Sequence, residues 1–121
     1  MTLIIKEPSI IKAAGNKEKI IKEFFGKVNS KTSEVSIALM KSPEGWSEPG
    51  QCPEFSEYTV VLKGKLKITT KKDEFIITEG QGIMTTRDVW VKYSTPFEGG
   101  AEYIAVCLPA FSPELVKRDD E

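Results

Sequence analysis

Glu57 is the residue of this sequence best suited to chemistry. It opens the run 57–63, where strand alternation puts Glu57, Thr59 and Val61 on one face. A carboxylate on an apolar inner wall has a raised pKa, which is the usual way of making a general acid or base. A glutamate at the start of a strand can equally be solvated or paired with a lysine. Catalysis by Glu57 is therefore a hypothesis, set beside that plainer interpretation.

The loop before Glu57 holds four more candidates for ligand binding. Glu48, Gln51 and Glu54 offer carboxylate and amide oxygens, which suit a hard cation or a polar ligand, although such residues are also ordinary in polar turns. Cys52 can bind metal or attack an electrophile as a thiolate. The chain has no histidine to activate it, so we expect this thiol to be inert or weakly reactive.

The remaining candidates are one arginine and three aromatic residues. Arg87 can hold a carboxylate or phosphate with its planar fork, or simply pair with Asp88 at a surface turn. Aromatic walls around a flat or apolar ligand are available from Trp46, Trp90 and Tyr93. Such large side chains also fill cores and form dimer interfaces, and the sequence leaves both interpretations open.

The composition excludes several classes of function. The 121 residues carry 17 basic and 18 acidic side chains, a formal charge of −1, and no histidine. The absent histidine removes Ser–His and Cys–His nucleophiles and imidazole metal ligands. Near-neutral charge removes the basic field of a nucleic-acid binder. The apolar runs are too short to span a bilayer. We expect no nucleic-acid partner, no membrane partner and a reducing, cytoplasmic setting, since the two cysteines form no disulfide framework.

The elements that must position these residues are mostly strands. The apolar spacing of 15–26, with Asn16 before it and Gly26 at its end, predicts a peripheral helix. Ser112 and Pro113 begin a short C-terminal helix. We expect a single domain over 1–121, with a barrel core at 34–108 and a C-terminal extension at 109–121. Its predicted strands are 34–40, 57–63, 65–70, 74–78, 83–86, 90–94 and 102–108.

Two segments of this β region resemble the motifs of the cupin superfamily. The run 50–64, with six residues between Glu57 and Gly64, is similar to the first cupin motif, in which two histidines precede the glutamate. Residues 79–91 resemble the second motif, which ends in a histidine. The resemblance implies an all-β, cupin-type β-barrel jelly roll. It also implies that the Glu57 face is the inner one, and that Gly64 makes a tight turn between strands.

The metal ligands of the cupin motifs are missing. The two histidines of the first motif fall on Gly50 and Cys52, or on Gln51 and Pro53 if the spacing is one residue shorter, and that of the second falls on Val91. One surviving carboxylate cannot hold a transition metal. We therefore expect no cofactor. If a metal does bind, its ligands are Glu57, Gln51 and Cys52.

A distant similarity to the ethanolamine-utilisation cupins also indicates a cupin without the metal histidines. These also lack the metal histidines and share a segment like 56–64 and a late apolar strand followed by proline and an aromatic residue, as in 106–111. Some of them are credited with acetate-kinase activity, but this chain has no Gly-rich phosphate loop.

We therefore predict a small-molecule-binding cupin with a degenerate, metal-free site in the barrel mouth. Two alternatives stay open. One is a cupin enzyme, of isomerase, lyase or acetate-kinase-like activity, that uses Glu57 as acid/base or an unusual oxygen-rich metal site. The other is a non-catalytic structural module. The resemblance also implies a homodimer, because cupins commonly pair through sheet edges and N-terminal strands, and the apolar strand-like segments Leu3–Lys6 and Ile10–Ile11 could serve for this.

Overall fold

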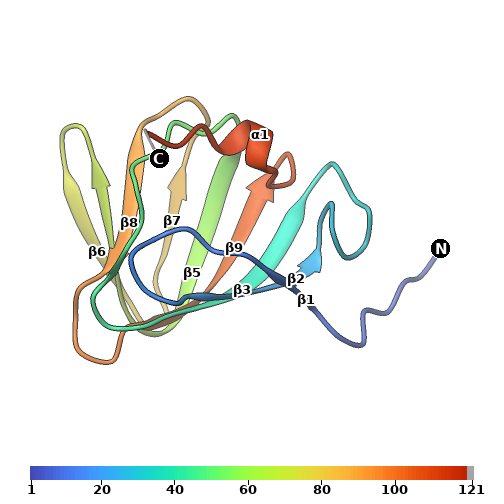
Figure 1. Ribbon diagram of the computed structural model, residues 1–121, viewed down its shortest axis with the longest axis horizontal. Coiled ribbons are helices and arrows are strands. Elements are labelled where there is room, and N and C mark those ends of the chain that lie inside the picture. Colours follow the sequence, from blue (N-terminus) through green and yellow to red (C-terminus); the bar gives the residue numbers. More distant parts are fainter. Residues whose placement is uncertain (120–121) are drawn as a thin grey trace.

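The fold is a curled antiparallel sheet with one short helix. The structure, a computed structural model, describes residues 1–119 (Figure 1). Its elements are β1 (Ser9–Ile11), β2 (Ile20–Phe25), β3 (Ser36–Ser42), β4 (Trp46–Ser47), β5 (Ser56–Thr70), β6 (Glu74–Thr78), β7 (Gly82–Thr85), β8 (Val91–Thr95), β9 (Ala101–Leu108) and α1 (Pro113–Val116).

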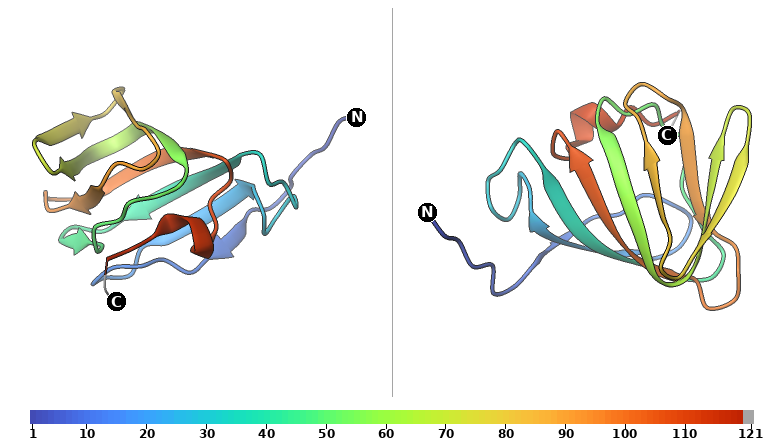
Figure 2. Two further views of the ribbon diagram at one scale, coloured as in Figure 1. Left: turned by 90° about the horizontal axis from the view of Figure 1, so that it is seen from above. Right: turned by 180° about the vertical axis from the view of Figure 1, so that it is seen from behind.

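The strand order shows how the sheet closes on itself. Its path runs β1-β2-β3-β9-β5-β8-β4, and β6 and β7 also pair with β5. The first half of β5 pairs with β9 and β7, whereas its second half pairs with β6 and β8. Because one strand serves both halves, the sheet folds over along β5 into a half-barrel, as Figure 2 shows from two sides.

The bend lies at Gly64, within β5 rather than between two strands. The predicted strands 57–63 and 65–70 are one continuous element, so the tight turn expected at Gly64 is wrong. Gly64 has φ +80°, and a Cβ built there would stand 2.1 Å from the carbonyl oxygen of Gly100. Only glycine gives the chain both that backbone conformation and that close approach.

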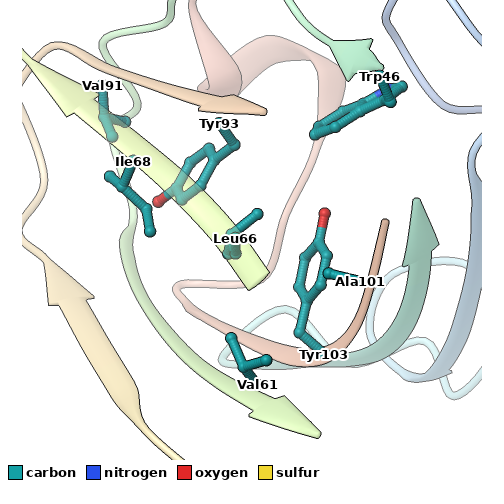
Figure 3. Packing of buried hydrophobic residues seen from close by; sticks show 8 residues of the cluster. All are labelled: Trp46, Val61, Leu66, Ile68, Val91, Tyr93, Ala101 and Tyr103. Carbon is teal, nitrogen blue, oxygen red and sulfur yellow. The ribbon is translucent and has the colours of Figure 1, made fainter. Parts of the chain in front are cut away.

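The apolar core lies inside the bend. Eight buried side chains from β4, β5, β8 and β9 point toward one another there (Figure 3). The alternation predicted for the first half of β5 is confirmed, since Glu57, Thr59 and Val61 are buried whereas the intervening side chains are more than 40% exposed. The core residues are Trp46, Val61, Leu66, Ile68, Val91, Tyr93, Ala101 and Tyr103.

The predicted helix over 15–26 is wrong, because this segment holds strand β2. Asn16 does not cap a helix: its side-chain oxygen accepts a hydrogen bond from the Ser47 amide at 2.8 Å. From Ile20 onward the backbone pairs with both β1 and β3. β-Branched and aromatic residues suit such a position, and pairing covers an edge of β3 that a helix would leave open.

The two ends of the chain differ in their packing. The short C-terminal helix is confirmed as α1, and it covers one end of the half-barrel (Figure 1). Residues 1–7 form no strand and extend away from the sheet, although Ile10 and Ile11 do lie in β1. No helix within residues 1–119 is long and apolar enough to cross a membrane. The last two residues of the predicted extension, 120–121, lie outside the described residues.

Candidate functional site

A cavity opens on the inner face of the half-barrel. Its unfilled space, counted out to the open mouth, is about 700 Å³. The wall is mostly apolar, with a few polar and charged groups turned into it. The lining residues are Ile11, Lys12, Lys19, Ile21, Glu23, Ser36, Ala38, Met40, Glu48, Gln51, Phe55, Glu57, Tyr93, Tyr103, Ala105, Cys107, Phe111 and Arg118.

Strand register explains why Glu57 faces this cavity. Glu57 lies opposite Cys107 of β9, which in turn lies opposite Ser36 of β3. Side chains directly opposite in antiparallel strands project to the same face. The three form one row across the inner wall, and Glu57 is only 8% exposed.

Burial sets the protonation of Glu57. Burial and, to a smaller extent, the nearby carboxylate of Glu48 raise the pKa of the Glu57 carboxyl from an ordinary 4.5 to about 7, against a smaller lowering by Lys19. A carboxyl group of this kind is about half protonated at neutral pH. It can therefore give or take a proton under ordinary conditions.

Lys19 supplies the positive charge beside these carboxylates. Its ammonium group lies 4.1 Å from the centre of the Trp46 ring and 5.2 Å from that of Tyr103. Burial lowers the pKa of Lys19, but Tyr103, Glu48 and Glu57 together raise it by more, so Lys19 stays charged. Lys19 was not among the predicted site residues, because the helical spacing of 15–26 placed it inside a predicted helix. Lys19, Ile21 and Glu23 share the phase of a strand, and that pattern could have revealed it.

A second row of side chains borders the cavity near its C-terminal side. The backbone of Gln51 pairs with Val91 on one side, through two hydrogen bonds of 2.8 and 2.9 Å, and with Arg118 on the other. Gln51, Pro53 and Glu57 are all buried, whereas Cys52 is exposed. The cupin resemblance left two alignments of the first-motif histidines open. The alignment on Gln51 and Pro53 agrees with the structure, because these two residues are buried like Glu57, whereas Cys52 of the other alignment is not.

Five of the eight predicted ligand-binding residues do not line the cavity, namely Trp46, which is buried in the core, and four others. Cys52 is exposed. Glu54 pairs with Lys117 at 3.3 Å. The Arg87 guanidinium donates to the Leu108 carbonyl at 3.4 Å, with no ion pair to Asp88 among residues 1–119. Trp90 donates its indole N–H to Asp119 at 3.0 Å, and Lys71 lies over its ring.

The other two aromatic candidates belong to the buried core. Trp46 is 1% exposed and donates its indole N–H to the Ala14 carbonyl at 3.0 Å. Tyr93 lines the cavity, and its hydroxyl shares a 3.0 Å hydrogen bond with Thr85. Burial raises the pKa of Tyr93 well above its ordinary value, so its hydroxyl stays protonated.

Glu23 is a second buried residue of the cavity wall that was not among the predicted site residues. It is 3% exposed and accepts hydrogen bonds from the backbone amides of Val28 and Asn29, at 3.1 and 2.7 Å. These bonds hold the turn after β2. We therefore assign Glu23 a structural role.

The residues at the usual metal positions do not fit a transition-metal site. Gln51, Pro53 and Val91 stand where the cupin histidines would be, and they supply one amide oxygen between them. Within residues 1–119, no three His, Cys, Asp or Glu side chains come together in a way that could hold a metal ion. The polar groups of the cavity are instead suited to hydrogen bonding and proton transfer.

Comparison with known sequences gives one informative relative. No protein-family model matches the chain. It is 41% identical, over 97 residues, to the protein named endoribonuclease YbeY of Myxococcus xanthus (strain DK1622). The match covers 80% of this chain but only 33% of that protein. About two thirds of the Myxococcus protein thus lies outside the match, and its named activity is not carried over.

Comparison with solved structures identifies the fold. An RmlC-like cupin of Shewanella frigidimarina superposes with a TM-score of 0.72 at 15% identity, over 93% of this chain and 94% of its own. The polyketide cyclase RemF of Streptomyces resistomycificus gives 0.75 at 14%, over 100% and 86%. The EutQ protein of Clostridium difficile gives 0.64 at 20%, over 76% and 63%. At these identities the likeness shows the fold alone, and that fold is the cupin fold.

Proposed function

We propose that this protein binds a small organic molecule in the inner cavity of its half-barrel, without a transition metal. One observation carries the proposal: an apolar wall surrounds a few inward polar groups, Glu48, Gln51 and Glu57. Small-molecule sites have this composition. The cupin fold of the structural neighbours is consistent with this role but does not name a ligand.

The charges in the cavity favour a polar ligand over a purely apolar one. Lys19 lies in the field of Glu48 and Glu57, so the site holds both signs of charge in a poorly hydrated space. Charged groups interact strongly there. A ligand with at least one hydrogen-bonding group would use them, whereas a hydrocarbon would not.

A second candidate function is proton-transfer catalysis by Glu57, as in an isomerase or a lyase. The pKa of about 7 supports it, because a general acid/base works best when its pKa is close to the working pH. The acetate-kinase-like alternative has no comparable support in the cavity.

We also propose a homodimer in a reducing, cytoplasmic setting. The outer face of the sheet exposes apolar side chains of neighbouring strands, among them Val60, Met84 and Leu108. Exposed apolar faces of this kind favour association. Neither Cys52 nor Cys107 is in a disulfide. Sedimentation at micromolar concentration should give the mass of a dimer, and a monomer alone would rule the dimer out.

A thermal-shift screen with a matched pair of variants tests ligand binding. Ala105→Leu adds bulk to the cavity wall, whereas Val106→Leu adds it to the opposite face of the same strand. A compound at 100 times its Kd stabilises the folded form by about 2.7 kcal/mol. We expect hits that are lost in Ala105→Leu and kept in Val106→Leu. Circular dichroism checks that both variants fold.

Two results would contradict the proposal. One is a set of hits that bind Ala105→Leu as well as wild type. The other is stoichiometric metal, measured by elemental analysis, that disappears in Glu57→Ala. For the catalytic candidate, NMR in D₂O should show exchange of a C–H proton in a bound hit for deuterium, and Glu57→Gln should abolish it.

A further inference from the structure

We infer that Gln51 and Arg118 together anchor a 2-hydroxycarboxylic acid in the cavity. This inference rests on the proposed binding function and specifies the class of ligand. Arg118 would take the carboxylate and Gln51 the adjacent hydroxyl group.

The C-terminal segment brings Arg118 to the site. After α1, residues 117–119 run antiparallel to the loop before β5, where the amide of Cys52 donates to the Lys117 carbonyl at 3.0 Å and that of Asp119 donates to the Gly50 carbonyl at 2.8 Å. Gln51 and Arg118 are the bridged pair between these bonds. The Cβ atoms of such a pair lie about 5 Å apart, and the two side chains project to one face. Both line the cavity.

Each of these side chains has a buried polar atom left without a partner. Oε1 of Gln51 and Nε of Arg118 are inaccessible to solvent, and neither has a hydrogen-bond partner among residues 1–119. Gln51 as a whole is only 4% exposed. Buried donors and acceptors are nearly always paired in folded proteins. An acceptor and a cationic donor side by side therefore point to a bound molecule that supplies both bonds.

The other inward charges of the cavity are already engaged, whereas Lys12, which also lines it, is exposed to solvent. Lys19 lies in the field of Glu48 and Glu57, and Glu23 holds two backbone amides. Arg118 takes part in none of the ion pairs formed among residues 1–119. Its natural counterpart is thus an anionic group of the ligand, for which a guanidinium is well suited.

The unpaired side-chain oxygen of Gln51 narrows the class of ligand further. A carboxylate alone would satisfy Arg118 but would leave the Gln51 oxygen without a donor. A hydroxyl on the neighbouring carbon supplies that donor. The rings of Phe55 and Phe111, with centroids 5.9 Å apart, form an apolar wall close by, and the Arg118 guanidinium carbon lies 5.9 Å from the Phe111 ring centre. An aromatic or aliphatic substituent can pack there.

Calorimetry with three related probes tests the inference. Mandelate has both groups, phenylacetate lacks the hydroxyl, and benzyl alcohol lacks the carboxylate. We expect mandelate to bind roughly two- to tenfold more tightly than phenylacetate, the effect of one neutral hydrogen bond, and roughly tenfold or more tightly than benzyl alcohol, the effect of a charged one. Gln51→Leu should remove the first preference, and Arg118→Gln the second. Lys117→Gln, next to Arg118 and exposed, is the control and should keep both.

Several outcomes would overturn the inference. These are no binding of mandelate or lactate at millimolar concentration, equal binding of the three probes, or unchanged preferences in both variants. If Gln51→Leu fails to fold, the Nε–H signal of Arg118 in wild type must still shift in NMR on addition of mandelate. Hits that depend on the cavity but include no 2-hydroxy acid would refute this inference and leave the proposed function standing, whereas hits unaffected by Ala105→Leu would refute both.

Discussion

Replacing Glu57 by glutamine should change how the stability of the protein depends on pH. Glutamine has nearly the same shape but does not titrate, so Glu57→Gln removes one ionisation from the cavity wall. The carboxyl has its pKa raised from 4.5 to about 7 by burial and by Glu48. The folded protein therefore holds this proton more tightly than the unfolded chain does. The contribution to stability is fully present below pH 4.5 and is lost as the pH rises through 7.

The size of the effect follows from the two pKa values. Their difference corresponds to about 3 kcal/mol in total, at about 1.4 kcal/mol for each tenfold change in proton affinity. Most of it, roughly 2 to 3 kcal/mol, falls between pH 5 and pH 8. Glu57 is 8% exposed, so solvent screening does little to reduce this figure.

Urea denaturation of wild type and Glu57→Gln at pH 5 and pH 8 measures the effect. We expect the difference in unfolding free energy between them to move by roughly 2 to 3 kcal/mol in favour of the variant on going to pH 8. This double difference cancels the titration of all groups that do not interact with Glu57. Glu79→Gln, at an exposed glutamate, is the control and should show no such change. A difference for Glu57→Gln that is the same at both pH values would refute the assignment of Glu57 as a buried, half-protonated carboxyl.

Two further predictions concern the thiols and the bend in β5. Cys52 is exposed, whereas Cys107 is buried and burial raises the pKa of its thiol. A thiol reagent should therefore label one cysteine per chain in the native protein and two in urea. Rapid labelling of both cysteines in the native protein would contradict the packing of β9. Gly64→Ala and Gly80→Ala meet the same backbone strain, with φ of +80° and +82°, but only the first adds a clash. In urea denaturation, the free energy of unfolding should fall by about 1 kcal/mol for Gly80→Ala and by several kcal/mol for Gly64→Ala. Equal losses for the two variants would show that the bend in β5 relaxes easily.

The sequence was informative about the strands but not about the segment before them. The alternation at 57–63 predicts which face of β5 is buried, because a half-buried strand must separate its apolar and polar sides. The segment 15–26 misleads because Ile20, Ile21, Phe24 and Phe25 have helical spacing, and because buried Glu23 breaks the strand alternation. A carboxylate that receives backbone amide bonds can occupy an inward position, but its partners cannot be identified before the turn after β2 is known.

The sequence predicts a residue of the candidate site only where the local strand pattern decides which way its side chain points. Glu57, Gln51 and Glu48 lie in the cavity because they are in, or just before, the strand that carries the cupin-like spacing. Lys19 and Arg118 come from opposite ends of the chain, and only the sheet topology brings them together. The chain has two arginines, and the sequence offered no reason to prefer Arg118 over Arg87.

The cavity lacks the histidines of a metal cupin, but its wall carries other charged groups that can bind a ligand. A metal cupin concentrates positive charge at one point, held by imidazole ligands that here are replaced by Gln51, Pro53 and Val91. In this chain three cationic side chains line the cavity, namely Lys12, Lys19 and Arg118. Separate cationic side chains, with Glu57 between protonation states, can orient an anionic ligand and exchange a proton with it. The same inner wall is thus suited to recognition by hydrogen bonds, which the mandelate series and the Glu57 titration test independently.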